Sequence, residues 1–186
     1  MIFQTEETEV SVSHERLDVV DENDDVIEVR TRGEIHALGL MHRAVHILVF
    51  NSRGEVFLQK RSLCKDEQPG KWDSSAAGHV DSGEDYLGCA RREIDEELGI
   101  VADHSLQALF KLPASELTGN EHCMVYRYRH DGPLELHPDE IDDGRWISPA
   151  ELDRRVAGND AELTEAVCLI WKRYRELGHK TGQTGL

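Results

Sequence analysis

The sequence predicts a mixed fold of the α/β (α+β) class, and three observations support this prediction. Short β-like runs rich in Val, Ile, Leu and Phe alternate with stretches whose apolar residues recur at helical spacing. The length of 186 residues suits one domain. No internal repeat and no linker-like stretch divides the chain. We therefore expect a single domain over residues 15–177, with a flexible acidic arm at 1–14 and a flexible polar tail at 178–186.

Charge and composition limit the partners of the chain. The chain carries 37 acidic and 21 basic side chains and a net charge of −16, which disfavours nucleic acids and anionic membranes as partners. No apolar run approaches the roughly 20 residues of a membrane span, and the N-terminus lacks the basic and apolar blocks of a signal peptide. Four widely spaced cysteines without a CxxC pattern are typical of reduced thiols. We expect a cytoplasmic protein.

The N-terminal part of the domain is expected to begin with a hairpin. Residues 17–20 and 26–29 are β-like runs on either side of an acidic turn cluster. Residues 31–38 predict a short helix that ends at Gly39. The strands after this helix are expected at residues 42–50, 55–60, 72–77, 106–112, 122–130 and 144–147. The first two of these strands are expected to pair as a second hairpin across a tight turn at 51–54.

Two helices are expected near the C-terminus. Ser148 at the N-cap and Pro149 at the first helical position favour a helix that starts there. The last helix is predicted over residues 163–177, with an apolar stripe of Leu163, Val167, Ile170, Trp171 and Tyr174. This stripe suits the core of the domain. A dimer face is the alternative, so a homodimer stays open.

The stretch from Gly78 to Ile100 organises the rest of the chain. A helix is predicted over residues 85–98, with Ser82 or Gly83 at its start and Gly99 after its end. Its expected buried face consists of Leu87, Ala90, Ile94 and Leu98.

Three glutamates share another face of this helix: Glu93, Glu96 and Glu97. Carboxylates at this spacing repel one another, so a helix that keeps them is expected to hold a divalent cation. Oxygen ligands suit Mg²⁺ or Mn²⁺. The alternative, an ordinary acidic surface helix, explains the glutamates but neither the glycines nor the Arg92–Glu93 pair.

A fixed pattern runs through the same stretch: Gly, five residues, Glu, seven residues, then Arg-Glu-U-x-Glu-Glu-x-Gly-U, where U is bulky and apolar. It is filled by Gly78, Glu84, Arg92, Glu93, Ile94, Glu96, Glu97, Gly99 and Ile100. The stretch therefore resembles the Nudix box. The resemblance implies a metal-dependent pyrophosphohydrolase that cleaves a phosphoanhydride bond of a nucleoside diphosphate linked to another group, X, with water as the nucleophile.

The resemblance also implies roles for the residues of the box. The metal ligands for Mg²⁺ or Mn²⁺ would be the three glutamates of the helix and the backbone carbonyl of Gly78. Glu96 or Glu93 would be the catalytic group that deprotonates or orients the water. Glu84 and Arg92 would pair with each other and brace the motif.

Further segments resemble the isopentenyl diphosphate isomerase-like branch of the Nudix superfamily, over residues 17–156. They are His42-Arg-Ala, Gln59-Lys-Arg-Ser62, Pro69-Gly-Lys-Trp72, Ser75-Ala-Ala-Gly-His79 and Asn120-Glu-His-Cys123. This resemblance implies a mixed β-sheet sandwiched between helices. It also implies further metal ligands for Zn²⁺, Mn²⁺ or Fe²⁺ and contacts to the diphosphate. The matching metal ligands are His42, His79 and Glu121, with His36 as a further candidate, and the phosphate contacts are Arg61 and Lys65.

The chain departs from the isomerases at two positions. Ala77 stands where they carry a catalytic cysteine, and Gly119 replaces a glutamate. Moving a double bond needs a proton donor and a proton acceptor on opposite faces, and a methyl group is neither. Hydrolysis of a small-molecule diphosphate of the nucleotide type is therefore favoured. The alternatives are an isopentenyl diphosphate isomerase-like enzyme and a catalytically silent regulator that binds a nucleotide.

Overall fold

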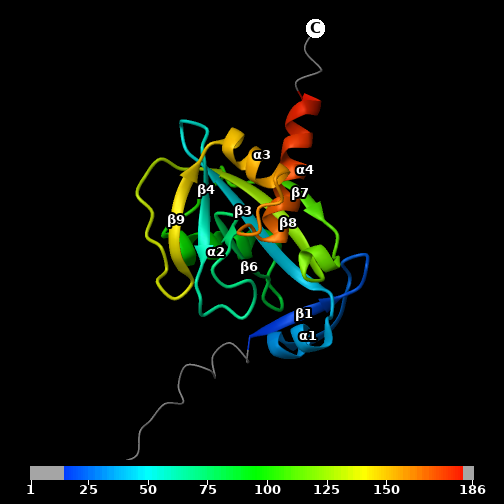
Figure 1. Ribbon diagram of the computed structural model, residues 1–186. Coiled ribbons are helices and arrows are strands. Elements are labelled where there is room, and N and C mark those ends of the chain that lie inside the picture. The colour runs from blue at the N-terminus through cyan, green and yellow to red at the C-terminus, as the bar shows by residue number, and fades with distance from the viewer. Residues whose placement is uncertain (1–14, 182–186) are drawn as a thin grey trace, which may run out of the picture.

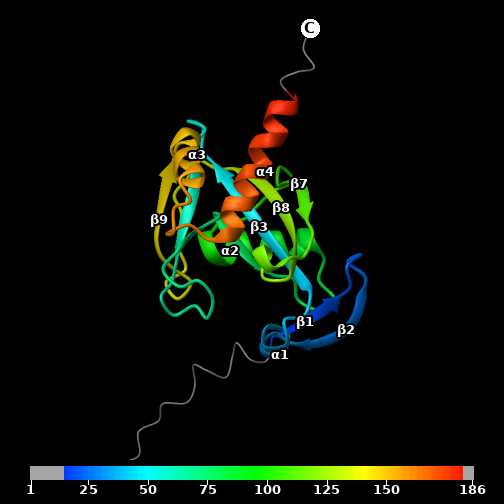
Figure 2. The same ribbon diagram turned by 45° about the vertical axis from the view of Figure 1, so that its right-hand side comes forward.

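The structure, a computed structural model, describes residues 15–181, so the predicted arm at 1–14 and residues 182–186 of the predicted tail lie outside the described residues. A seven-stranded mixed sheet lies between helix α2 (Tyr86–Leu98) on one face and helices α3 (Pro149–Ala157) and α4 (Glu165–Thr181) on the other (Figure 1 and Figure 2). The prediction of a mixed sheet sandwiched between helices is confirmed.

The sheet is built around two parallel central strands. Its strands are β3 (His42–Phe50), β4 (Val56–Arg61), β5 (Trp72–Asp73), β6 (Ala76–His79), β7 (Gln107–Leu112), β8 (Glu121–Arg129) and β9 (Ile141–Ile147). The order is β5-β4-β3-β8-β7, with β6 paired to β3 and β9 paired to β4. β3 and β8 run parallel, whereas the other neighbours are antiparallel. The 3₁₀ turn η2 (Glu116–Thr118) precedes β8.

The predicted N-terminal hairpin and helix are confirmed. β1 (Arg16–Val20) and β2 (Val26–Thr31) form a separate two-stranded antiparallel sheet, and α1 (Arg32–Leu38) follows directly. Thr31 caps this helix, because its side chain accepts a hydrogen bond from the Glu34 backbone N–H and the Glu34 carboxylate accepts one in return. The helix ends, as predicted, at a left-handed glycine.

The predicted hairpin of β3 with β4 is wrong beyond its first residue pair. The register joins Phe50 to Val56, after which β3 continues with β6 and β8, and β4 with β5 and β9. The buried Ser75 lies where the two strands diverge: its Oγ accepts a 2.7 Å hydrogen bond from Val49 N and donates one of 2.6 Å to Phe57 O. Ser75 thereby satisfies backbone groups that the diverging strands leave without a ladder partner.

Two other strand predictions differ from the structure. The strand expected at 72–77 is divided into β5 and β6, because the Ser74 backbone N–H bonds to Asp73 Oδ1 and not to a neighbouring strand. β9 begins at Ile141 and not at residue 144 as predicted. β4 is buried on both faces, since Phe57 packs on the α2 side and Leu58 on the α4 side.

Helix α2 begins later than predicted. Its N-cap is Asp85, whose side chain accepts a 2.7 Å hydrogen bond from the Gly88 backbone N–H. The predicted starts, Ser82 and Gly83, lie in the preceding turn, where Ser82 Oγ donates a 2.7 Å hydrogen bond to Asp18 of the hairpin. A cap therefore depends on which side chain is still free once tertiary contacts have formed.

The buried face of α2 is confirmed at three of its four predicted positions. Ala90, Ile94 and Leu98 are fully buried against the sheet, whereas Leu87 is 37% exposed. Cys89 is buried in its place. The buried face of the helix is therefore rotated from the predicted stripe toward the side that carries Glu93 and Glu97.

On the opposite face, the stripe of α4 lies in the core, as expected in preference to a dimer face. Its members Val167, Ile170 and Trp171 are at most 1% exposed. The helix starts at Glu165 and continues to Thr181, past its predicted end at residue 177, while Leu163 lies before it in a β-bridge with Trp72.

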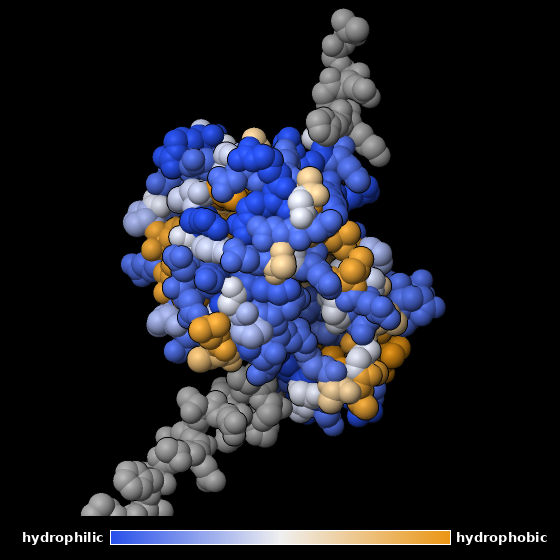
Figure 3. All heavy atoms as spheres, in the orientation of Figure 1, coloured by the Kyte–Doolittle hydropathy of each residue, from blue (hydrophilic) through white to orange (hydrophobic). Residues whose placement is uncertain are grey.

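The polar composition of the chain is visible on one face of the molecule. Hydrophilic side chains cover most of the face in Figure 3, with separate hydrophobic patches between them.

All four cysteines are free, as predicted. Between residues 15 and 181, no helix is both long and apolar enough to cross a membrane.

Candidate active site

Three consecutive residues of β6 organise the site. The backbone N–H of Ala77 donates a 3.0 Å hydrogen bond to Glu97 of α2. Gly78 faces Glu93 of the same helix. His79 points the other way, as the alternation of a strand requires, and its Nε2 lies 3.1 Å from Glu121. β6 therefore separates a carboxylate cluster, made of Glu93 and Glu97, from a histidine cluster on its other side.

The Glu97 side chain is buried, and two hydrogen bonds hold it in place. Its Oε2 accepts hydrogen bonds of 2.9 Å from Gln59 Nε2 and 3.0 Å from the Ala77 N–H. Burial raises the pKa of Glu97 to about 7, although nearby Lys65 and these two hydrogen bonds act in the opposite sense. Gln59 is absent from the site residues predicted from the sequence. The signal that could have found it is a lone amide in an otherwise apolar part of a strand.

Glu93 packs directly against the backbone of β6. A Cβ atom on Gly78 would lie 2.0 Å from Glu93 Oε1, so only glycine leaves room for the carboxylate. Burial and the charge of Glu97 raise the pKa of Glu93 to about 8, although Arg92 opposes both. Two adjacent buried carboxylates with raised pKa values form a site that gains from a bound cation.

The remaining residues of the motif lie around this pair. Arg92 bonds to both oxygens of Glu84, with Nε–Oε1 at 3.2 Å and Nη2–Oε2 at 2.9 Å, so the expected pair is present. Arg92 Nη1 also lies 2.6 Å from Glu93 Oε1. The Glu96 side chain is 57% exposed and lies at the solvent edge, 3.3 Å from Arg92. The face shared by the three glutamates is thus buried at Glu93 and Glu97 and open at Glu96.

Both predicted phosphate-binding cations lie near the carboxylate cluster. Burial lowers the pKa of Lys65, although the negative charges of Glu97 and Glu93 act to raise it. Lys65 also forms an ion pair with Glu140. Arg61 bonds to the Glu67 carbonyl at 3.1 Å through Nε. The chain folds this way because Arg61 ends β4 and Lys65 lies in the loop that follows.

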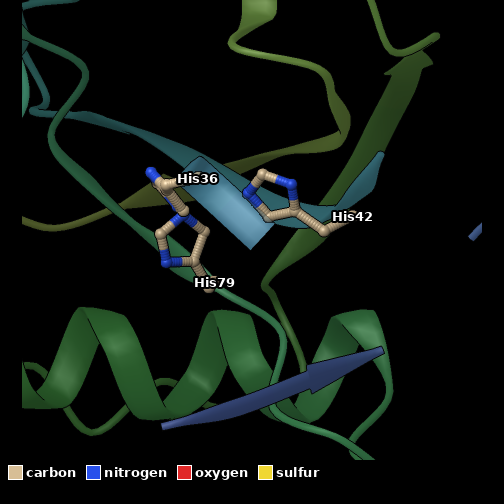
Figure 4. Close-up of side chains that lie close together, drawn as sticks. All are labelled: His36, His42 and His79. Carbon is tan, nitrogen blue, oxygen red and sulfur yellow. The ribbon is translucent and has the colours of Figure 1, made fainter. Parts of the chain in front are cut away.

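The histidine cluster gathers residues that are far apart in the sequence. The parallel register of β3 with β8 places His42 beside Glu121, and the antiparallel register with β6 places His79 beside Ala44. α1 contributes His36. The ring centroids of the three histidines are 5.0 to 5.2 Å apart, and Figure 4 shows the rings turned toward one another.

The chemistry of this cluster also suits a cation. Nε2 of His36 is buried without a hydrogen-bond partner among the described residues, and Nε2 of His42 lies 3.5 Å from Glu121 Oε1. Burial opposes ionisation of Glu121, yet hydrogen bonds from His42 and His79 hold its pKa well below the usual range. Burial lowers the pKa of His79, which favours a neutral imidazole. The ligand nitrogens of His36, His42 and His79 lie within 4.8 Å of one another, and imidazole is a ligand type that suits Zn²⁺, Mn²⁺ or Fe²⁺.

Comparisons of the sequence with known proteins agree with these observations. The NUDIX domain model matches residues 40–167. An uncharacterized Nudix hydrolase of Yersinia pestis is 39% identical over 166 residues, which cover 87% of this chain and 88% of the relative. A Nudix hydrolase of Deinococcus radiodurans is 33% identical over 166 residues, which cover 89% and 97%.

Solved structures share the fold. A crystal structure from Deinococcus radiodurans matches with a TM-score of 0.77 and 31% identity, over 86% of this chain and 98% of that one. The NUDIX domain of Shewanella oneidensis NrtR, solved in complex with ADP ribose, matches with a TM-score of 0.56 over 78% of this chain and 97% of its own. At 16% identity, this second likeness concerns the fold alone.

Proposed function

The chain belongs to the Nudix hydrolase family, whose members act on pyrophosphate bonds, and we propose that its substrate is a nucleoside diphosphate linked to a further group, X. The observation that carries this proposal is the pair of buried carboxylates, Glu93 and Glu97, beside the cations Arg61 and Lys65. Such a site offers a place for a divalent ion and cationic groups for the phosphates next to it.

The residues that would hold Mg²⁺ or Mn²⁺ are Glu93, Glu96 and Glu97, together with the backbone carbonyl of Gly78. When bound, the ion supplies positive charge at the phosphoanhydride oxygens, where negative charge develops during cleavage. Gln59 and the Ala77 N–H hold Glu97 in place, so this ligand does not need to reorganise when the ion binds.

Two glutamates are candidates for the group that deprotonates or orients the attacking water. Glu96 is open to solvent and can reach a water molecule beside the substrate. Glu93 is buried and engaged by Arg92. Glu84 and Arg92 bond to each other and brace the motif, and Arg92 orients Glu93.

The histidine cluster supports a second cation site, with His42, His79, Glu121 and His36 as ligands. Isopentenyl diphosphate isomerase-like proteins bind a metal through matching residues, so this cluster favours that branch as a second candidate function. Ala77 disfavours isomerisation itself, because its methyl group can neither donate nor accept the proton that the reaction moves.

The test is a hydrolysis screen with Mg²⁺ and with Mn²⁺ on nucleoside di- and triphosphates, nucleotide sugars, dinucleotides, coenzyme A and isopentenyl diphosphate. We expect turnover of one class, reduced by roughly 10²-fold or more in Glu97→Gln, because the variant lacks one ligand charge. The matched control is Asp95→Asn, an exposed position of the same helix.

Near-wild-type turnover in Glu97→Gln would contradict the role of Glu97 as a metal ligand. Isomerisation of isopentenyl diphosphate by the unmodified protein would favour the second candidate function. Nucleotide binding without turnover of any compound would indicate a silent regulator.

A further inference from the structure

One residue, Glu67, contacts both the histidine cluster and the phosphate-binding cations. Its side-chain Oε1 lies 2.8 Å from Nδ1 of His36. Its backbone carbonyl accepts a 3.1 Å hydrogen bond from Nε of Arg61. A continuous path of three residues thus joins an imidazole of the cluster to a guanidinium beside the carboxylates.

The contact with Glu67 determines which nitrogen of His36 faces the cluster. A carboxylate accepts hydrogen bonds, so Nδ1 of His36 carries the proton and Nε2 keeps its lone pair. His42 is also held through Nδ1, which donates a 3.0 Å hydrogen bond to the carbonyl of Leu40. Nε2 of His36 is buried without a partner among the described residues, and Nε2 of His42 lies 3.5 Å from Glu121 Oε1. Glu67 therefore orients one imidazole for metal binding, as the Leu40 carbonyl orients another.

The loop that carries Glu67 depends on α1 for its position. Its ends are fixed by backbone hydrogen bonds, from Arg61 N to Lys71 O and from Ser62 N to Glu140 O, both 2.9 Å. Its middle is tied to α1 by the ion pair of Asp66 with Arg32 at 3.4 Å and by the contact of Glu67 with His36. His36 is therefore in direct contact with the middle of the loop, two residues after Lys65.

We infer that Glu67 is a positioning residue that couples occupation of the histidine cluster by a divalent metal to the placement of the loop 62–71 and its phosphate-binding cations. The inference rests on the proposed second metal site and deepens it. A metal on Nε2 holds the His36 ring, the ring holds Glu67, and the Glu67 carbonyl holds Arg61. Because linkage is reciprocal, a diphosphate bound to the loop also strengthens metal binding at the histidines.

The experiment uses the full chain in excess Mg²⁺, which occupies oxygen ligands, and Co²⁺ as the probe for imidazole ligands. Visible absorption of Co²⁺ reports the affinity of the histidine cluster, and amide hydrogen exchange reports the order of residues 62–71. In the wild type, Co²⁺ should bind and slow exchange in this loop. In Glu67→Ala, the affinity for Co²⁺ should fall by roughly 10- to 100-fold, and exchange in the loop should no longer respond to the metal.

Three control variants isolate the role of Glu67. Glu67→Gln keeps an acceptor oxygen for His36 and should restore much of the lost affinity. Asp66→Ala removes a carboxylate from the same loop that pairs with Arg32, and it should leave the affinity for Co²⁺ within about twofold of the wild type. His42→Ala removes the metal site, and in that background Glu67→Ala should have no further effect on Co²⁺ binding.

Two affinity results would overturn the inference: Glu67→Ala binds Co²⁺ as tightly as the wild type, or Asp66→Ala loses as much affinity as Glu67→Ala. A wild-type loop whose amide exchange rate does not change when Co²⁺ binds would overturn it as well. An imidazole–Co²⁺ spectrum that survives in His42→Ala would show that the metal site itself is misplaced, and it would overturn the inference too. Hydrolysis that depends on Glu97 is measured separately, so the proposed hydrolase function can stand when the coupling fails.

Discussion

At the scale of single residues, the site depends on close contacts that leave no room for a different side chain. Glu93 Oε1 occupies the place where any Cβ on Gly78 would lie, at 2.0 Å. Gly78 does not have a left-handed φ, so backbone conformation does not require a glycine there. The requirement is the space that the Glu93 carboxylate occupies. One position therefore allows the carboxylate to approach the backbone of β6.

Gly78→Ala should displace Glu93 and weaken metal binding while the core stays intact, because the three atoms nearest to the added methyl group all belong to this flexible side chain. We expect activity at subsaturating Mg²⁺ to fall by roughly 10- to 100-fold. The measurement is a Mg²⁺ titration of turnover, together with Mg²⁺ affinity by calorimetry. Gly33→Ala is the matched control, since its Cβ would meet no atom within 4 Å. Unchanged Mg²⁺ affinity in Gly78→Ala would contradict the steric role of Gly78.

At the scale of elements, local sequence signals predicted most helices and strands but not all of their partners. The capping signals at Ser148 and Pro149 act within a few residues of the chain, and the structure confirms them. The start of α2 was misplaced because Ser82 bonds to the hairpin, a contact that the sequence does not show. The hairpin of β3 with β4 failed because Ser75 separates the strands.

Asp85→Ala should lower the free energy of unfolding by about 1 kcal/mol, because α2 loses the side chain that accepts a hydrogen bond from Gly88 N–H. Urea unfolding at neutral pH measures this difference. Asp95→Ala, near the opposite end of the same helix, removes the same charge without removing a cap and serves as the control. If both variants lose equal stability, the cap is not at Asp85.

At the scale of the whole molecule, burial of the carboxylate cluster makes stability depend on pH and on metal. Glu93 and Glu97 have pKa values raised to about 8 and about 7 in the folded state. An unfolded glutamate titrates near pH ~4.3. A raised folded pKa contributes stability that is fully present below the unfolded value and is lost as the pH rises through the folded value.

Metal-free protein in EDTA should therefore lose stability between about pH 5 and pH 8, and Mg²⁺ should raise the melting temperature more at the upper end of this window. Thermal melts at each pH, with EDTA and with Mg²⁺, measure both effects. The Glu93→Gln, Glu97→Gln double variant should lose most of the slope and most of the response to Mg²⁺. Glu121, whose pKa is lowered, acts only in more acidic solution. An equal shift by Mg²⁺ at both ends of the window would contradict this account.

The sequence by itself determined the fold class, most elements, the motif from Gly78 to Ile100 and the family, because each depends on local periodicity or on fixed spacing along the chain. Only the tertiary structure decided which side chains meet. The strand registers bring His42, His79 and Glu121 to one place. Gln59 joins the site through its hydrogen bond to Glu97 of α2, and Glu67 through its contact with His36 of α1. Long-range contacts leave no local pattern, since they depend on how distant strands and helices pack.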